Sequence, residues 1–112
     1  MRTDRLRLLD AIEQIELISI FSIRGREAFF QDLMLQSAIL HRLALLGEAC
    51  RGVSQESRDS HPEIPWSQII AFRNIIMHEY FGIDVELVWV IVAEHIVKLS
   101  TQIKLMMDSL SE

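Results

Sequence analysis

The sequence has few of the residues that end regular structure. Among its 112 residues there are only four glycines and two prolines, whereas half of the residues are hydrophobic. Glycine and proline are common at helix ends and in turns, so their scarcity favours long helices joined by few turns. A chain of this length is expected to form one domain, residues 1–112, that buries roughly two-thirds of its unfolded surface.

Segments that would direct the chain out of the cytoplasm are also missing. Cys50 is the single cysteine, so no disulfide can form within the chain. The charged stretch at 1–14 lacks the pattern of a signal or transit peptide. The most apolar run, VELVWVIVA at 85–93, is well short of the roughly 20 residues needed to cross a bilayer. We therefore expect a cytoplasmic protein with no membrane-spanning segment.

Positive charge is in short supply. The formal net charge is −5, whereas nucleic-acid-binding proteins usually contact phosphates through clustered lysine and arginine. A broad basic face is excluded, so any contact with RNA must be made at a small, locally positive place.

Apolar residues recur at helical spacing in four stretches. The predicted helices span about 3–23, 27–51, 65–80 and 84–110. Thr3 or Asp4 caps the first, Gly52 ends the second, Pro65 opens the third and Asp84 caps the fourth. The polar stretch between the second and third helices holds both prolines and is predicted to be a loop with one helical turn. This order of elements predicts an all-α fold, an up-and-down bundle of four to five helices.

The first half of the fourth helix is apolar on every side, from Val85 to Val92. A helix that is apolar on every side is stable in water only when other elements bury all of its faces. Two alternatives remain open at this point: deep burial within one chain, or burial in the interface of a dimer.

The third helix carries the most reactive side chains of the sequence, in the stretch RNIIMHEY at 73–80. Its predicted core-facing residues are Ile69, Phe72, Ile75 and Ile76. On a wheel of about 100° per residue, Asn74 and His78 lie about 100° and 140° from Arg73, and Tyr80 lies within about 20° of it. The polar groups therefore lie off the core face.

Two apolar residues, Ile70 and Met77, share the polar arc of this helix. A purely solvated face rarely contains such residues. The mixture is typical of the wall of a groove.

Arginine and histidine together suit phosphodiester cleavage. A guanidinium offers fixed N–H donors to phosphate oxygens and stays charged. An imidazole can accept or donate a proton near neutral pH. Cleavage of RNA through its 2′-hydroxyl needs both a base and an acid, and a symmetric dimer with two facing motifs would supply two histidines and two arginines. The plainer alternative is that Arg73 and His78 are surface or capping groups near a helix end, where the helix dipole favours histidine.

The other candidate residues point to structural roles. His41, His61, His95 and Cys50 have no partner at metal-ligand spacing, so no metal site and no cofactor is predicted. His41 is predicted to be an interior or interface residue. Glu48 either pairs with an arginine near the motif or faces water, and a structural role is favoured. Trp66 and Trp89 are predicted core or interface anchors.

The motif and its surroundings resemble the HEPN-domain proteins, in particular the HepT toxin family. Arg73, His78 and Tyr80 match the family's Arg-x4-His-x-Tyr signature, and Asn74 is the polar residue after the arginine. The segments HRLALLGEACRGVS at 41–54, IPW at 64–66 and FGIDVELVW at 81–89 are also similar to the family pattern. The resemblance extends from about residue 5 to 105.

This resemblance implies a HEPN-like helical bundle that dimerises with its motifs in a shared cleft. It implies a metal-independent endoribonuclease, the toxin of a toxin–antitoxin pair. By position, Arg73 would bind phosphate, His78 would be the acid/base, and Asn74 and Tyr80 would position the substrate. Tyr80 resembles the tyrosine that an MntA-type nucleotidyltransferase antitoxin modifies with AMP (AMPylation). The alternative is a noncatalytic helical dimer that binds, and is modified by, such a partner.

Overall fold

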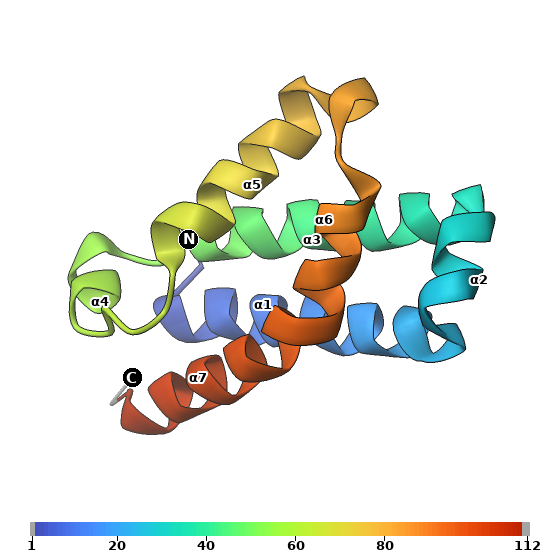
Figure 1. Cartoon of the computed structure of the whole chain (residues 1–112). Helices are drawn as coiled ribbons and strands as arrows, with labels where there is room; N and C mark the ends of the chain where they lie inside the picture. The colour runs from blue at the N-terminus through green and yellow to red at the C-terminus, as the bar shows by residue number, and fades with distance from the viewer. Residues whose placement is uncertain (1, 111–112) are drawn as a thin grey trace.

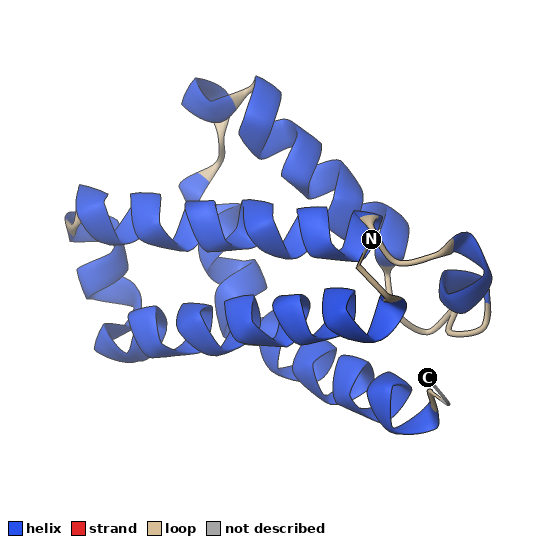
Figure 2. Cartoon of the chain, turned by 180° about the vertical axis from the view of Figure 1, so that it is seen from behind, coloured by secondary structure: helices blue, strands red, loops and turns tan. Residues whose placement is uncertain are grey.

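The computed structural model describes residues 2–110 of the chain, and these contain helices and turns but no strand (Figure 2). The elements in order are α1 (Asp4–Phe21), η1 (Ser22–Arg24), α2 (Gly25–Gln31), α3 (Leu33–Arg51), α4 (Gln55–Asp59), α5 (Trp66–His78), η2 (Tyr80–Gly82), α6 (Val85–Val90), the π-helical turn η3 (Ile91–His95) and α7 (Ile96–Ser109). The prediction of an all-α helical bundle is confirmed.

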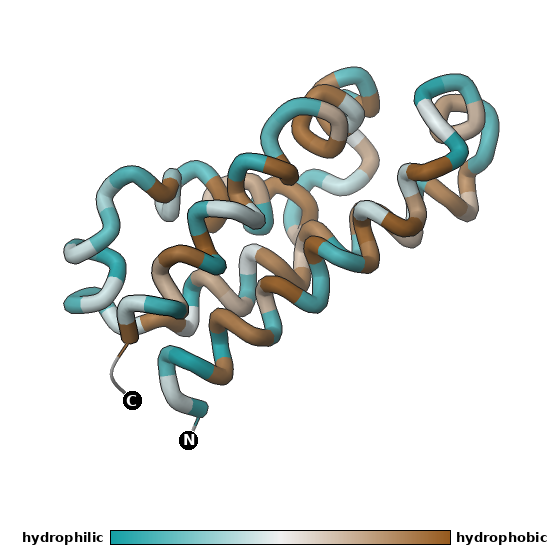
Figure 3. Tube along the Cα trace, turned by 90° about the horizontal axis from the view of Figure 1, so that it is seen from below, coloured by the Kyte–Doolittle hydropathy of each residue, from teal (hydrophilic) through white to brown (hydrophobic). Residues whose placement is uncertain are grey.

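Two long helices form the base of the bundle. α1 and α3 lie side by side and run in opposite directions, α7 packs beneath α1, and α5 packs on the other side of α3 (Figure 1). Along each helix, apolar and polar residues alternate at short intervals (Figure 3), which places one apolar stripe against the neighbouring helix. Leu8, Ile18, Ile39 and Ile103 are fully buried in the resulting core.

The second predicted helix is wrong as a single element, because Asp32 divides it into α2 and α3. Asp32 has an extended backbone, and its side chain accepts a hydrogen bond from the backbone N–H of Leu35 at 3.1 Å. The side-chain amide of Gln36 donates a hydrogen bond to the backbone carbonyl of Phe29, near the end of α2, at 2.9 Å. An aspartate that caps a helix competes with continued helical backbone, which explains the break. The bond from Leu35 and the guanidinium of Arg24 lower the pKa of Asp32.

The fourth predicted helix is also interrupted. Asp84 caps its start, as expected, by accepting hydrogen bonds from the N–H groups of Glu86 and Leu87. The chain then bends at the five-residue π-helical turn η3 before α7 (Figure 1), as such turns commonly do. Val88 is fully buried, but Leu87 and Val90 remain 48% and 37% exposed. The alternative of complete burial within one chain is therefore wrong for this segment.

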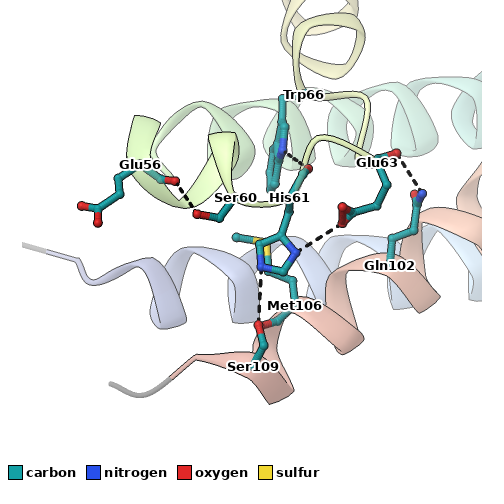
Figure 4. Close-up of polar contacts among 8 residues, drawn as sticks. All are labelled: Glu56, Ser60, His61, Glu63, Trp66, Gln102, Met106 and Ser109. Carbon is teal, nitrogen blue, oxygen red and sulfur yellow. Dashed lines mark hydrogen bonds and ion pairs between the residues drawn. The ribbon is translucent and has the colours of Figure 1, made fainter.

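The polar segment between α3 and α5 contains one short helix, α4, as predicted. The indole N–H of Trp66 donates to the carbonyl of His61 at 3.0 Å, and Gln102 of α7 donates to the carbonyl of Glu63 at 3.0 Å (Figure 4). The ring of His61 contacts the Glu63 carboxylate at 3.3 Å and the Ser109 hydroxyl at 3.4 Å. These bonds fasten the start of α5 to α7, and Trp66 is a buried anchor, as expected.

Two further sequence predictions concern aromatic and histidine side chains. Trp89 is half-buried and its ring stacks at a tilt on Phe29, with centroids 5.3 Å apart, which confirms its anchoring role. His41 is exposed on α3, so the interior alternative for it is wrong. No helix among the described residues combines the length and the hydropathy needed to span a membrane.

Candidate functional site

The motif occupies the second half of α5 and the turn that follows it. α5 starts after Pro65 and ends at His78, because Glu79 adopts φ −133° and ψ 37°, outside the helical region. The N–H of Glu79 still donates to the carbonyl of Ile75 at 2.8 Å and closes the last turn. The predicted helix end at residue 80 is therefore two residues too late. Tyr80 lies in η2, so its predicted wheel position beside Arg73 does not apply.

Arg73 is held firmly on the side of α5 that faces α3. Its side chain is 20% exposed, and one terminal nitrogen lies 3.2 Å from a carboxylate oxygen of Glu48. The other terminal nitrogen donates to the side-chain carbonyl of Asn74 at 3.0 Å. The guanidinium thus has two fixed partners, one on each helix.

Gly47 makes this placement possible. A Cβ atom at residue 47 would lie 2.3 Å from the Cβ of Arg73 and 2.9 Å from its Cγ. Any larger residue would therefore push α5 away from α3 or force Arg73 out of its place. Gly47 and Glu48 together determine where the guanidinium lies.

His78 and Asn74 are exposed on the outer side of α5. They are four residues apart and hence on one face of the helix, whereas Arg73 and His78 differ in direction by about 140°. Among the described residues, the His78 side chain has no hydrogen-bond or ion-pair partner. The structure therefore brings Arg73 to Asn74 and Glu48, but it does not bring Arg73 into contact with His78.

The turn after α5 exposes aromatic and apolar side chains. Tyr80 is 44% exposed, and the Phe81 side chain is as exposed as in an isolated peptide, at 103%. The two rings meet edge to face, with centroids 5.9 Å apart. On α5, Met77 is exposed, and Ile75, which was predicted to face the core, is 39% exposed. The core-face prediction is wrong for Ile75 and confirmed for Ile76, which is buried.

A cleft of about 430 Å³ lies elsewhere, between α3, α5, η3 and α7. Apolar residues including Leu46, Phe72 and Leu99 line it, and Lys98 and His95 lie among its polar residues. None of the four motif residues lines this cleft. The cleft and the motif therefore belong to different sides of α5.

Within residues 2–110, no group of three or more His, Cys, Asp or Glu side chains is placed to hold a metal ion. Cys50 is buried, and this burial raises the pKa of its thiol to about 12. A thiol in this state is a poor nucleophile.

Comparison with known proteins identifies the family. Residues 8–106 match the family described as Ribonuclease HepT-like. The chain belongs to the HepT-like ribonucleases. This confirms the predicted HEPN, HepT-like family and the predicted enzyme class, a ribonuclease of the HEPN type.

Two relatives of this HepT-like chain match it over about two thirds or more of both lengths. "Probable ribonuclease HepT" of Thermococcus cleftensis is 36% identical over 99 residues, which cover 85% of this chain and 87% of that protein. "Putative RNase MJ1380" of Methanocaldococcus jannaschii is 35% identical over 77 residues, covering 69% and 71%.

One relative is considerably longer. "Gamma-glutamylcyclotransferase and putative RNase MJ0434" of Methanocaldococcus jannaschii is 33% identical over 114 residues, and the chain spans 51% of its length. No solved structure matches the chain.

Two residues that shape the site carried only a weak signal in the sequence. Gly47 lies inside a helix, where glycine is unfavourable, and this is a sign of close packing. Glu48 was predicted either to pair with an arginine or to face water, and it pairs with Arg73. The partner could not be named in advance, because the contact joins two helices.

Proposed function

We propose that this HepT-like protein is a metal-independent endoribonuclease that cleaves RNA with the Arg73–His78 motif in the cleft of a homodimer. The observation that carries the proposal is the position of the motif: Arg73 is fixed by two partners, while His78 is exposed one helical turn beyond Asn74. A fixed cation and an accessible imidazole, carried by the same helix but pointing in different directions, are the two groups that transfer of a phosphoryl group to a neighbouring hydroxyl requires.

The proposed reaction uses the nucleophile of the RNA itself. A base takes the proton of the 2′-hydroxyl, and the 2′ oxygen attacks the adjacent phosphorus. The bond to the 5′ oxygen breaks, an acid protonates that oxygen, and the products are a 2′,3′-cyclic phosphate and a 5′-hydroxyl. Arg73 stabilises the negative charge on the phosphorane, and Asn74 and Tyr80 position the substrate.

A dimer supplies the second proton-transfer group. One chain has one histidine in the motif, so His78 of each protomer would act as base or acid at the same phosphate. Exposed apolar side chains gather in the segment from residue 75 to 90, where Met77, Phe81, Leu87 and Val90 have 55%, 103%, 48% and 37% exposure. Burial of these groups between two copies would bring both motifs together and stabilise the pair.

The same site suits control by a toxin–antitoxin partner in the cytoplasm. The Tyr80 ring is 44% exposed on the turn that follows His78. We propose that an MntA-type nucleotidyltransferase antitoxin transfers AMP from ATP to the Tyr80 hydroxyl, with release of pyrophosphate. The added phosphate would pair with Arg73 in the proposed dimer cleft and exclude RNA from it.

An RNA cleavage assay with the purified protein tests the proposed activity. We expect it to cut RNA in the presence of EDTA and to leave 2′,3′-cyclic phosphate ends. Replacement His78→Ala should lower the cleavage rate by about 10²–10⁴-fold, the usual contribution of general acid–base catalysis. His41→Ala is the matched control, because His41 is an exposed histidine outside the motif. Loss of activity in EDTA, or full activity of His78→Ala, would contradict the proposal.

The second candidate function is a noncatalytic dimer that binds a nucleotidyltransferase partner. The exposure of Tyr80 favours the noncatalytic function as much as it favours the nuclease function. Cell growth distinguishes the two. Overproduction without the antitoxin should arrest growth if the protein is a nuclease, and Arg73→Ala should relieve the arrest. Harmless overproduction would favour the noncatalytic function.

A further inference from the structure

Glu48 stands beside the proposed phosphate-binding group, although it is remote from it in sequence. It lies near the end of α3, and one carboxylate oxygen is 3.2 Å from a terminal nitrogen of Arg73. The same oxygen lies 3.4 Å from a terminal nitrogen of Arg51. The Glu48 carboxylate thus forms ion pairs with two arginines, and its contact with Arg73 joins α3 to α5.

The two contacts leave further N–H donors of the Arg73 guanidinium without a partner among the described residues. A guanidinium has five N–H donors, and within residues 2–110 Arg73 uses one terminal nitrogen for Glu48 and the other for Asn74. Each of these terminal nitrogens carries a second N–H, and the Nε–H is a further donor. Phosphate oxygens can therefore bind Arg73 while both partners stay in place.

Three neighbours together restrict the direction of Arg73. The first carbons of its side chain pack against Gly47, where no Cβ could fit, and its two ends are held by Glu48 and Asn74. A flexible arginine side chain has many rotamers, and fixing it before the substrate arrives removes an entropic cost from the transition state. Electrostatic stabilisation is effective when the donor already points to the place where charge develops.

We propose that Glu48 is a positioning residue for the ribonuclease reaction, which holds the Arg73 guanidinium in the direction that meets the phosphorane. This inference rests on the proposed function. Glu48 acts through Arg73 and contacts no reacting atom. A competing role, in which Glu48 occupies Arg73 and must be displaced by RNA, predicts the opposite effect of removing the carboxylate.

Steady-state RNA cleavage by Glu48→Ala and Glu48→Gln separates these roles. We expect Glu48→Ala to lower kcat by on the order of tenfold with little change in KM, because only the charge that develops in the transition state loses stabilisation. Glu48→Gln should recover most of kcat, because its amide oxygen can stand at the same short distance from the Arg73 guanidinium and accept from it. Arg51→Gln is the matched control, since it removes the other cation from Glu48 and leaves Arg73 untouched.

Two results would overturn the inference. If Glu48→Ala leaves kcat unchanged, the contact has no part in the reaction. If Glu48→Ala lowers KM or raises kcat, Glu48 competes with RNA for Arg73. Either result bears on Glu48 only when the wild-type protein cleaves RNA and His78→Ala does not. An inactive wild-type protein would instead contradict the proposed function. Thermal unfolding of each variant checks that the fold is intact.

Discussion

The two corners that flank α5 differ in how they are held. The first corner, residues 52–65, is polar in sequence and held by hydrogen bonds. Trp66 donates to His61, and Gln102 donates to Glu63 (Figure 4). The Asp4 carboxylate also accepts bonds from Ser54 and Ser57. The second corner, residues 79–84, is rich in apolar groups and leaves them in contact with solvent, above all Phe81.

The start of α5 thus contributes to stability, whereas the end of α5 contributes to the proposed function. The first corner uses its polar side chains to fasten the start of α5 to α1 and α7. The second corner directly follows His78, carries Tyr80 and leaves its apolar side chains exposed. A corner whose apolar groups remain uncovered is typical of a surface that another molecule covers.

The largest effect is expected at the second corner. Phe81→Ser removes the most exposed aromatic ring beside the motif, so we expect the dimer to dissociate and cleavage to fall on the order of a hundredfold, since one histidine is lost from each cleft. Met34→Ser is the control, because Met34 is 82% exposed in α3 and lies outside the segment from 75 to 90. Sedimentation and cleavage assays measure both. A dimeric and active Phe81→Ser protein would show that the interface lies elsewhere.

A smaller effect is expected where α5 crosses α3. Gly47→Ala would place a Cβ 2.3 Å from that of Arg73, and such overpacking costs about 1–3 kcal/mol. We expect cleavage to fall by about tenfold, as Arg73 is displaced.

Gly52→Ala, at the C-cap of the same helix, is the comparison for Gly47→Ala. Its added Cβ would meet the far end of the Arg7 side chain, which can move. Its cleavage rate should stay at the wild-type level. Equal loss of activity in the two variants would contradict a specific role for the crossing.

The smallest effect is expected at the first corner and concerns stability alone. Burial raises the pKa of Asp4, but hydrogen bonds from the Ser54 hydroxyl, the Ser57 hydroxyl and the Ser54 N–H lower it more, so it lies below its ordinary value of 3.8. The folded state therefore favours the carboxylate. Its stabilising contribution is present above about pH 4 and is lost as the pH falls through the lowered pKa.

Asp4→Asn should therefore lower the free energy of unfolding by about 1 kcal/mol at pH 7, by less at pH 3, and leave cleavage unchanged. Denaturant unfolding at the two pH values measures this. Asp108→Asn is the control, because Asp108 is exposed. A loss of stability at pH 7 that does not shrink on acidification would contradict the assignment.

Features set by nearby residues were predictable from the sequence. Helix periodicity predicted the all-α fold, and Asp84 predicted the start of α6. The start of α1 was predicted with Thr3 or Asp4 as its cap, and Thr3 is the cap. Features that depend on competition or on distant contacts were not. Asp32 divides α2 from α3 because its side chain caps the second of them. The π-helical turn before α7 inserts a bend that periodicity does not reveal. The contact of Glu48 with Arg73 joins residues 25 positions apart in sequence and exists only once α3 and α5 have packed.

The arrangement of two copies around the motif can be measured by the distance between spin labels. Glu79→Cys puts a label on an exposed position next to His78, and Glu56→Cys puts one on the first corner. Cys50 is buried and its pKa is raised to about 12, so it should stay unlabelled. If the two motifs face each other in a dimer, the labels at residue 79 lie clearly closer together than those at residue 56. A pair at residue 79 that is the more distant of the two, or no dipolar signal at either position, would contradict this arrangement.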